Sequence, residues 1–300
     1  MELDQLRSFV AVAEVRSFTR AAKLVHLSQP AISRQIGRLE SEMGTPLFER
    51  YGRHVECTAD GRLLLPLAKA IVSRADDASR LIREHVGTVA AKVRFGSTGT
   101  VFAHLLSPVL ASFLESYPKV HLDLIEREDV LLEEAVGSGE LDCAIVTAWG
   151  TPRAATVHLL TEEVLLLVRS DHPLAQQSTV PLTAFADEPF LLPGLSMNMA
   201  NLLTDLCRQA GFEPRTPYRA NYLELSKALV RQGLGVALIP NMLLAPHTLD
   251  GLAALHLEGH PTRDLNLVYP RERPVSTAAR ALMIHIRASV ADHGVADLHQ

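Results

Sequence analysis

The chain has 300 residues, of which 47% are hydrophobic, and its 29 basic and 34 acidic residues give a formal net charge of −5. A length of this order predicts about two domains, and the hydrophobic fraction is sufficient for buried cores. No apolar run reaches the roughly 18 residues of a membrane span, and Glu2 and Asp4 carry the wrong charge for a secretory signal. Cys57, Cys143 and Cys207 are too isolated for a zinc or disulfide framework. Membrane and secreted classes are excluded, and a cytoplasmic location is expected.

Residues 3–40 predict three short helices. The first covers residues 3–13, and the second places four apolar side chains on an inner face, namely Phe18, Ala21, Ala22 and Leu24. Ser28 is positioned to cap the third helix, and Pro30 falls in its first turn, where a missing N–H is harmless. Ile32, Ile36 and Leu39 then recur at helical spacing and are expected to face inward.

The outward face of the third helix is polar and carries Gln29, Ser33, Arg34, Gln35 and Arg38. This arrangement is typical of a helix-turn-helix whose second helix reads the major groove of DNA. An ordinary amphipathic hairpin is the alternative. The next residues favour the DNA-binding interpretation, because residues 50–55 predict a hairpin wing. The predicted DNA-binding residues are Ser28, Gln29, Pro30, Ser33, Arg34, Arg38, Arg50 and Arg53.

Charge is unevenly divided along the chain. Residues 1–86 hold 13 basic against 11 acidic residues, and the remainder holds 16 against 23. An excess of this size is too small for bulk attraction to DNA, so individual arginines must supply the phosphate contacts.

Residues 59–86 predict one long helix that Thr58 caps. Its apolar stripe is expected to comprise Leu64, Leu67, Ala68, Ile71, Val72, Ala75, Ala78, Leu81 and Ile82. Such a stripe must be buried, either against its own domain or against a second copy of the chain. Residues 87–91 are expected to form a hinge.

The stretch from Leu3 to Arg83 resembles the N-terminal part of LysR-type transcriptional regulators. The residues that carry the resemblance include residues 27–33 (LSQPAIS), residues 47–50 (LFER), Phe18, Ala21 and Ala22. Residues 163–168, 172–175 and 233–240 match that family more diffusely. The resemblance implies a non-enzymatic, sequence-specific regulator of promoter DNA with inverted-repeat sites. It also implies a small-molecule effector, a dimerising linker helix, a homotetramer, and RNA polymerase as a further partner.

From Lys92 onward, short apolar strands alternate with helices, which predicts parallel sheets covered by helices. The expected fold class is α/β: a winged helix-turn-helix over residues 1–58, the linker helix, and a two-lobed effector domain over residues 92–300. Lobe I is expected over residues 92–161 and 269–293, and lobe II over residues 162–268. These lobes resemble the periplasmic-binding-protein fold.

Ligands in open α/β sheets bind at the carboxyl ends of strands. Ser97, Thr98 and Thr100 follow the first such strand, where hydroxyls and a helix N-terminus could seat an anion. The alternative is that these hydroxyls only cap the helix. The remaining predicted effector-binding residues are Thr147, Ser196, Met197, Asn198 and Tyr222.

Enzyme motifs such as GxSxG, GxxxxGK and HExxH are missing from the sequence. No enzymatic activity or cofactor is therefore expected. No metal is expected either, because the 13 histidines show no spacing typical of metal ligands. Two alternatives stay open. Cys207 could act as a redox sensor within the same family, although a structural thiol is favoured. A solute-binding protein would explain the two lobes but would leave the helix-turn-helix without a use.

Overall fold

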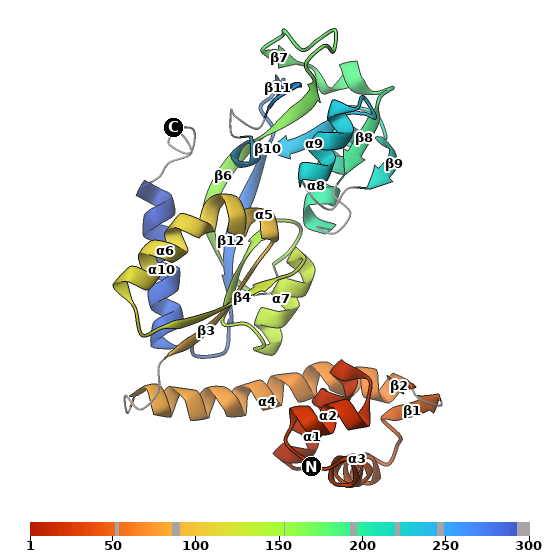
Figure 1. The fold of residues 1–300 in the computed structure, drawn as a ribbon, viewed down its shortest axis with the longest axis vertical. Coiled ribbons are helices and arrows are strands. Elements are labelled where there is room, and N and C mark those ends of the chain that lie inside the picture. Colours follow the sequence, from red (N-terminus) through yellow and green to blue (C-terminus); the bar gives the residue numbers. More distant parts are fainter. Residues whose placement is uncertain are drawn as a thin grey trace. The chain divides into compact units, whose positions relative to one another are not determined.

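The computed structural model describes residues 1–51, 54–85, 91–152, 154–192, 197–219, 223–244 and 249–292. Contacts divide the chain into two compact units, residues 1–90 with 137–140 and residues 91–136 with 141–300. Figure 1 shows the helices and strands of each unit. Within the described ranges, no helix is both long and apolar enough to cross a membrane.

The first unit contains three short helices, a hairpin and a long helix. These are α1 (Leu3–Val15), α2 (Phe18–Leu24), α3 (Gln29–Met43), β1 (Phe48–Tyr51), β2 (His54–Cys57) and α4 (Ala59–His85). The predicted caps are confirmed, since the Ser28 hydroxyl accepts the Ala31 N–H at 3.3 Å and the Thr58 hydroxyl accepts the Gly61 N–H at 2.9 Å. Ile32, Ile36 and Leu39 are buried, as their spacing predicted.

The wing is fixed to the helices by aromatic and polar contacts. The ring of Phe48 on β1 lies 5.2 Å from Phe9 and 5.9 Å from Phe18, measured between centroids. The carboxylate of Glu40 near the end of α3 accepts the N–H groups of Leu47 and Phe48 at 2.8 and 3.2 Å. These contacts hold the hairpin at a set position beside α3.

Leu24 was wrongly predicted to face inward. It is 61% exposed at the end of α2, whereas Phe18, Ala21 and Ala22 are buried. A helix turns by about 100° per residue, so Leu24 points well away from the face that the other three share.

The long helix α4 carries two apolar faces rather than the single predicted stripe. Leu64, Leu65, Ala68 and Val72 pack into the core of the first unit. A second face is between 41% and 72% exposed and comprises Leu63, Leu67, Ile71 and Ile82. The predicted stripe was therefore wrong in grouping Leu64 with Leu67, and it omitted Leu63. The exposed side chains recur every four residues or at multiples of about one turn, so they form one continuous face.

The second unit is built on one mixed sheet with the strand order β4-β3-β5-β12-β6-β11-β7, and β10 also pairs with β6. The strands of this sheet are β3 (Lys92–Ser97), β4 (His121–Glu126), β5 (Cys143–Thr147), β6 (Ala155–Arg169), β7 (Thr179–Val180), β10 (Ala237–Pro240), β11 (Leu252–Leu257) and β12 (Thr262–Tyr269). A separate parallel pair consists of β8 (Pro189–Leu192) and β9 (Arg215–Arg219).

The helices of this unit pack against the strands of the sheet. They are α5 (Gly99–Val101), the π-helix η1 (Phe102–Leu106), α6 (Ser107–Ser116), α7 (Asp129–Ser138), the 3₁₀ helices η2 (Leu182–Phe185) and η3 (Asn241–Leu243), α8 (Met197–Gln209), α9 (Leu223–Arg231) and α10 (Thr277–Asp292). We use lobe I for β3 to β5 with α5 to α7 and α10, and lobe II for β7 to β11 with α8 and α9. The long strands β6 and β12 run between the two lobes (Figure 1).

The predicted parallel sheets are confirmed only in part, because the main sheet is mixed. The strand β3 is parallel to β4 and β5, but β12 is antiparallel to both β5 and β6, and β6 is antiparallel to β10 and β11. The connection from β11 to β12 is only residues 258–261, a turn without a crossover helix. The strand β6 begins at Ala155, so it crosses the boundary that was expected between the lobes at residues 161 and 162.

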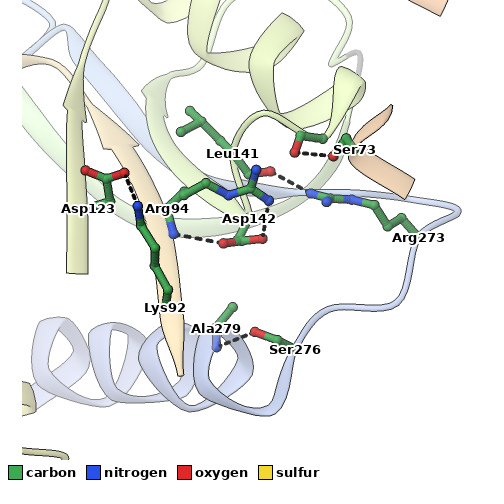
Figure 2. A network of polar contacts seen from close by, with 10 residues as sticks. Ser73, Lys92, Arg94, Asp123, Leu141, Asp142, Arg273, Ser276 and Ala279 are labelled. Atoms are coloured by element: carbon green, nitrogen blue, oxygen red, sulfur yellow. Dashed lines mark hydrogen bonds and ion pairs between the residues drawn. The ribbon is translucent and has the colours of Figure 1, made fainter. Parts of the chain in front are cut away.

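Buried charges are paired within the second unit. At the base of lobe I, Asp142 accepts the main-chain N–H of Arg94 at 2.8 Å and its guanidinium at 3.2 Å, and Arg273 donates to the Leu141 carbonyl at 2.6 Å (Figure 2). Between the lobes, Arg263 on β12 pairs with Glu162 on β6 at 2.6 Å, and both side chains are buried. These contacts fix the ends of strands that carry the residues considered below.

Candidate functional site

The outward face of α3 presents several of the residues predicted to read DNA. Gln29, Pro30, Arg34 and Arg38 are exposed, and Ser33 is half-buried with its hydroxyl 3.4 Å from the Gln29 amide nitrogen. Within the described residues, neither Arg34 nor Arg38 forms an ion pair. Two guanidinium groups are thus held on a rigid helix with their donors available to phosphates or base edges.

Four other residues that were predicted to face DNA either form hydrogen bonds within the protein or lie outside the described residues. Gln35 does not belong to the outward set, because its side-chain oxygen accepts a hydrogen bond from the Ser8 hydroxyl on α1. The hydroxyl of Ser28 is engaged as the cap of α3. The side chain of Arg50 and the whole of Arg53 lie outside the described residues.

The carboxyl ends of β3 and β5 lie side by side, and the predicted effector-binding residues of lobe I gather there. Ser97 is buried, and its hydroxyl donates to the Ile145 carbonyl at 3.2 Å, so it links the two strands. The hydroxyls of Thr98 and Thr100 lie 3.4 Å apart and are half-buried. Thr98 occupies the N-cap position of α5, yet its side chain makes no capping hydrogen bond. Within the structure these two threonine hydroxyls form a hydrogen bond with each other.

An acidic side chain faces the start of α5. A Cβ built on Gly99 would lie 2.3 Å from a carboxylate oxygen of Glu126, so any larger residue here would displace that carboxylate. The negative carboxylate occupies the end of the helix where an anion was expected to bind. A positive charge elsewhere is therefore needed if the ligand is an anion.

Thr147 and Asn198 join the two lobes directly. The Asn198 side-chain amide on α8 donates to the Thr147 carbonyl at the end of β5 at 2.8 Å, and both residues are buried. The Thr147 N–H in turn donates to the buried Asp129 carboxylate at 3.0 Å. Two residues that are 51 positions apart in the sequence thus form one contact between the lobes. Ser196, Tyr222 and the side chain of Met197 lie outside the described residues.

Lys227 is a residue that the sequence reasoning missed. Its side chain on α9 is 0% exposed, and its ammonium nitrogen lies 3.1 Å from a carboxylate oxygen of Glu224, which is 76% exposed. Burial and the charge of Lys227 together lower the pKa of the His104 imidazole on η1 of lobe I. Lys227 lies three residues before Val230, so the sequence places it on the same side of the helix as an apolar residue. This spacing was the available signal, because lysine is rarely buried.

A winged helix-turn-helix followed by a long helix and a two-lobed α/β unit defines a DNA-binding regulator with a ligand-binding domain. Two family profiles match this chain, "Bacterial regulatory helix-turn-helix protein, lysR family" over residues 3–62 and "LysR substrate binding domain" over residues 87–291. The chain belongs to the LysR family of transcriptional regulators. Members of this family regulate transcription and are not enzymes, and they bind DNA as oligomers.

Relatives and solved structures agree over nearly the whole chain. The uncharacterised HTH-type regulator YcgK of Bacillus subtilis is 30% identical, and the alignment covers 97% of this chain and 95% of YcgK. The dual regulator OxyR of Escherichia coli is 31% identical, with 98% and 97% covered. A full-length point variant of OxyR from Pseudomonas aeruginosa superposes with a TM-score of 0.73 at 25% identity, covering 96% of this chain and 98% of OxyR. Full-length BenM superposes with a TM-score of 0.60 at 28% identity, and the superposition covers 98% of this chain and 98% of BenM.

Proposed function

We propose that two copies of α3 bind an inverted-repeat promoter site and that a small anionic effector, held between lobes I and II, modulates this binding. The observation that carries the effector proposal is the fully buried Lys227 side chain on α9 of lobe II, whose charge also acts on His104 of lobe I. A carboxylate of the ligand beside this ammonium would add a favourable interaction between opposite charges away from solvent, where such interactions are stronger than in water.

The ligand would also contact hydroxyls of lobe I. Thr98 and Thr100 are the described candidates, and Ser196, Met197 and Tyr222 are proposed as further contacts in lobe II. Ser97, Thr147 and Asn198 would act by setting the positions of the strands and of the two lobes, because their polar atoms already bond within the protein. A ligand that prefers one arrangement of the lobes shifts the equilibrium by that preference alone.

Assembly is proposed to follow from the exposed apolar face of α4. Two such faces would pair across a two-fold axis and space two α3 helices along the operator. We retain the proposed division into residues 1–58 for DNA binding, 59–86 for dimerisation, 87–91 as a hinge and 92–300 for regulation. The lobes of the last part would also associate to give a tetramer, and RNA polymerase is proposed as a further partner.

The redox alternative rests on Cys207 and on the similarity to OxyR. The Cys207 side chain is buried in the core of lobe II, and this burial raises the pKa of its thiol to about 11. At pH 7 on the order of one such thiol in ten thousand is a thiolate, which is the form that reacts with peroxide. This argues for a structural role, and effector binding is the favoured mechanism.

Arg34→Ala should weaken specific DNA binding strongly and leave the fold intact. Loss of a bidentate base contact costs about 1–3 kcal/mol, or on the order of 10- to 100-fold in affinity. Fluorescence anisotropy with a duplex from the region upstream of its own gene measures this loss. Arg287→Ala, which removes an exposed arginine of α10, is the matched control and should bind like wild type. Wild-type affinity and specificity in Arg34→Ala would contradict the placement of α3 in the groove.

Lys227→Met should abolish the response to an anionic effector while promoter binding persists. Met keeps most of the buried volume and removes the charge, so the variant is expected to fold. A thermal-shift screen of aliphatic and aromatic carboxylates should identify a compound that raises the Tm of wild type and of Lys119→Met, which removes an exposed lysine, but not of Lys227→Met. Equal stabilisation of Lys227→Met would sink the proposal. A peroxide-induced change in DNA binding that Cys207→Ser removes would instead favour the redox alternative.

A further inference from the structure

Two histidines and a carboxylate converge at one edge of lobe II. Glu163 lies on β6, His256 on β11, and His260 in the turn that leads to β12. One carboxylate oxygen of Glu163 lies 2.9 Å from Nδ1 of His256 and 2.7 Å from Nδ1 of His260. The three potential ligand atoms are all within 4.8 Å of one another. Three donors from three segments thus point at one location.

The backbone fixes this arrangement. The strands β6 and β11 are antiparallel with Leu255 opposite Leu166, and continuation of that register puts His256 on the same face of the sheet as Glu163. His260 has a φ of 44°, in the left-handed region that residues other than glycine rarely adopt. The next residue, Pro261, accepts the Val164 N–H through its carbonyl at 2.8 Å, which anchors the turn beside Glu163.

The chemistry of the donors selects a class of cation. Two imidazole nitrogens and one carboxylate oxygen suit Zn²⁺ and neighbouring divalent transition metals, whereas Mg²⁺ and Ca²⁺ prefer oxygen ligands alone. Zinc bonds to such ligands are about 2.0–2.2 Å long. The three donor atoms already lie close together, so they need to move apart only slightly to leave room for a zinc ion between them at that bond length.

We propose that Glu163, His256 and His260 bind one divalent transition-metal ion on the surface of lobe II. His256 and His260 are 49% and 64% exposed, so water can complete the coordination and the ion can reach the site from solvent. Each Nδ1 atom then coordinates the ion in place of its hydrogen bond to the carboxylate, and the displaced proton passes to Nε2 of the same ring or to solvent water. The Glu163 charge partly neutralises the ion. The ion ties β6 to the end of β11 and to the turn that follows it.

The test uses the untagged full-length protein and zinc chloride alone. Isothermal titration should give one zinc site per chain in wild type. In His256→Gln/His260→Asn this site should weaken at least tenfold or disappear. Gln is accommodated on a strand and Asn tolerates the left-handed backbone at position 260, so the variant is expected to fold. His121→Gln/His158→Gln removes two exposed strand histidines elsewhere in this unit and should keep the wild-type affinity.

Cobalt provides a second measurement. Co²⁺ bound through two imidazoles and a carboxylate gives visible d–d absorption, which the wild type and the control variant should show and His256→Gln/His260→Asn should not. Glu163→Gln should reduce zinc affinity with both histidines in place, because it removes the negative ligand. Zinc affinity and cobalt absorption that are the same in His256→Gln/His260→Asn as in wild type would overturn the proposal, as would a wild type that binds no zinc at this stoichiometry.

Discussion

Ile71→Asp should remove the dimer contact between two α4 helices, so that the protein no longer reaches its wild-type assembly, and should reduce its affinity for an inverted-repeat DNA site by about 100-fold or more. Two linked binding units exceed the affinity of one by roughly 10²–10⁴, because the second contact is made at high effective concentration. Ile71 lies in the middle of the exposed face of α4, between Leu67 and Ile82. A charge at the centre of an apolar interface would remain unpaired when the interface forms, which strongly disfavours association.

The measurement is light scattering across a range of protein concentrations, together with DNA binding to full and half operator sites. Ile71→Asp should bind a half site as well as wild type does, since α3 is unchanged. Leu131→Asp on α7 is a matched control, as Leu131 is 47% exposed and Ile71 is 41% exposed. An Ile71→Asp variant with the same assembly as wild type, or a monomeric wild type at working concentration, would show that α4 does not carry the dimer contact.

Local sequence signals were sufficient for the helix caps of the first unit and for the inward face of α3. The caps Ser28 and Thr58, the first-turn Pro30, and the inward spacing of Ile32 and Ile36 all depend on neighbours within a few residues. Such features are encoded along one helix or turn, and a single sequence reveals them. The division of α4 into a packed face and an exposed face was not visible in the sequence, because both faces are apolar. Which face is buried depends on packing against α1 and the core of the first unit.

The second unit shows where sequence reasoning fails. The direction of a strand in the sheet depends on which distant segment it pairs with. The sequence of the turn between β11 and β12 did not reveal that both strands are antiparallel partners of β6. Glu163 and His256 are 93 positions apart, so no spacing pattern could join them. Lys227 was overlooked because a lone lysine in a helix is usually solvated, and its burial depends on tertiary packing that one helix sequence does not reveal.

Arg263→Met should lower the free energy of unfolding of the second unit by about 3–5 kcal/mol, the usual result of breaking a buried ion pair by removing one partner. Arg263 and Glu162 stand opposite each other on β12 and β6 and are buried, and the guanidinium also lies against the sulfur atoms of Met199 and Met242, at 3.8 and 3.5 Å. Loss of the arginine leaves the Glu162 carboxylate buried with the Met242 N–H, at 2.9 Å, as its described donor.

The double variant Glu162→Gln/Arg263→Met separates the charge from the packing. Gln retains an oxygen that can accept the Met242 N–H, and the pair then carries no charge, so most of the lost stability should return. Urea unfolding followed by circular dichroism measures both variants. A single variant that loses less than about 1 kcal/mol, or a double variant no more stable than the single one, would contradict a buried ion pair at this position.

Met199 lies beside Asn198, which bonds to Thr147 in lobe I. The ion pair on the strands that run between the lobes therefore also sets the helix whose contact reaches across them, and effector response should fall in Arg263→Met and recover in the double variant.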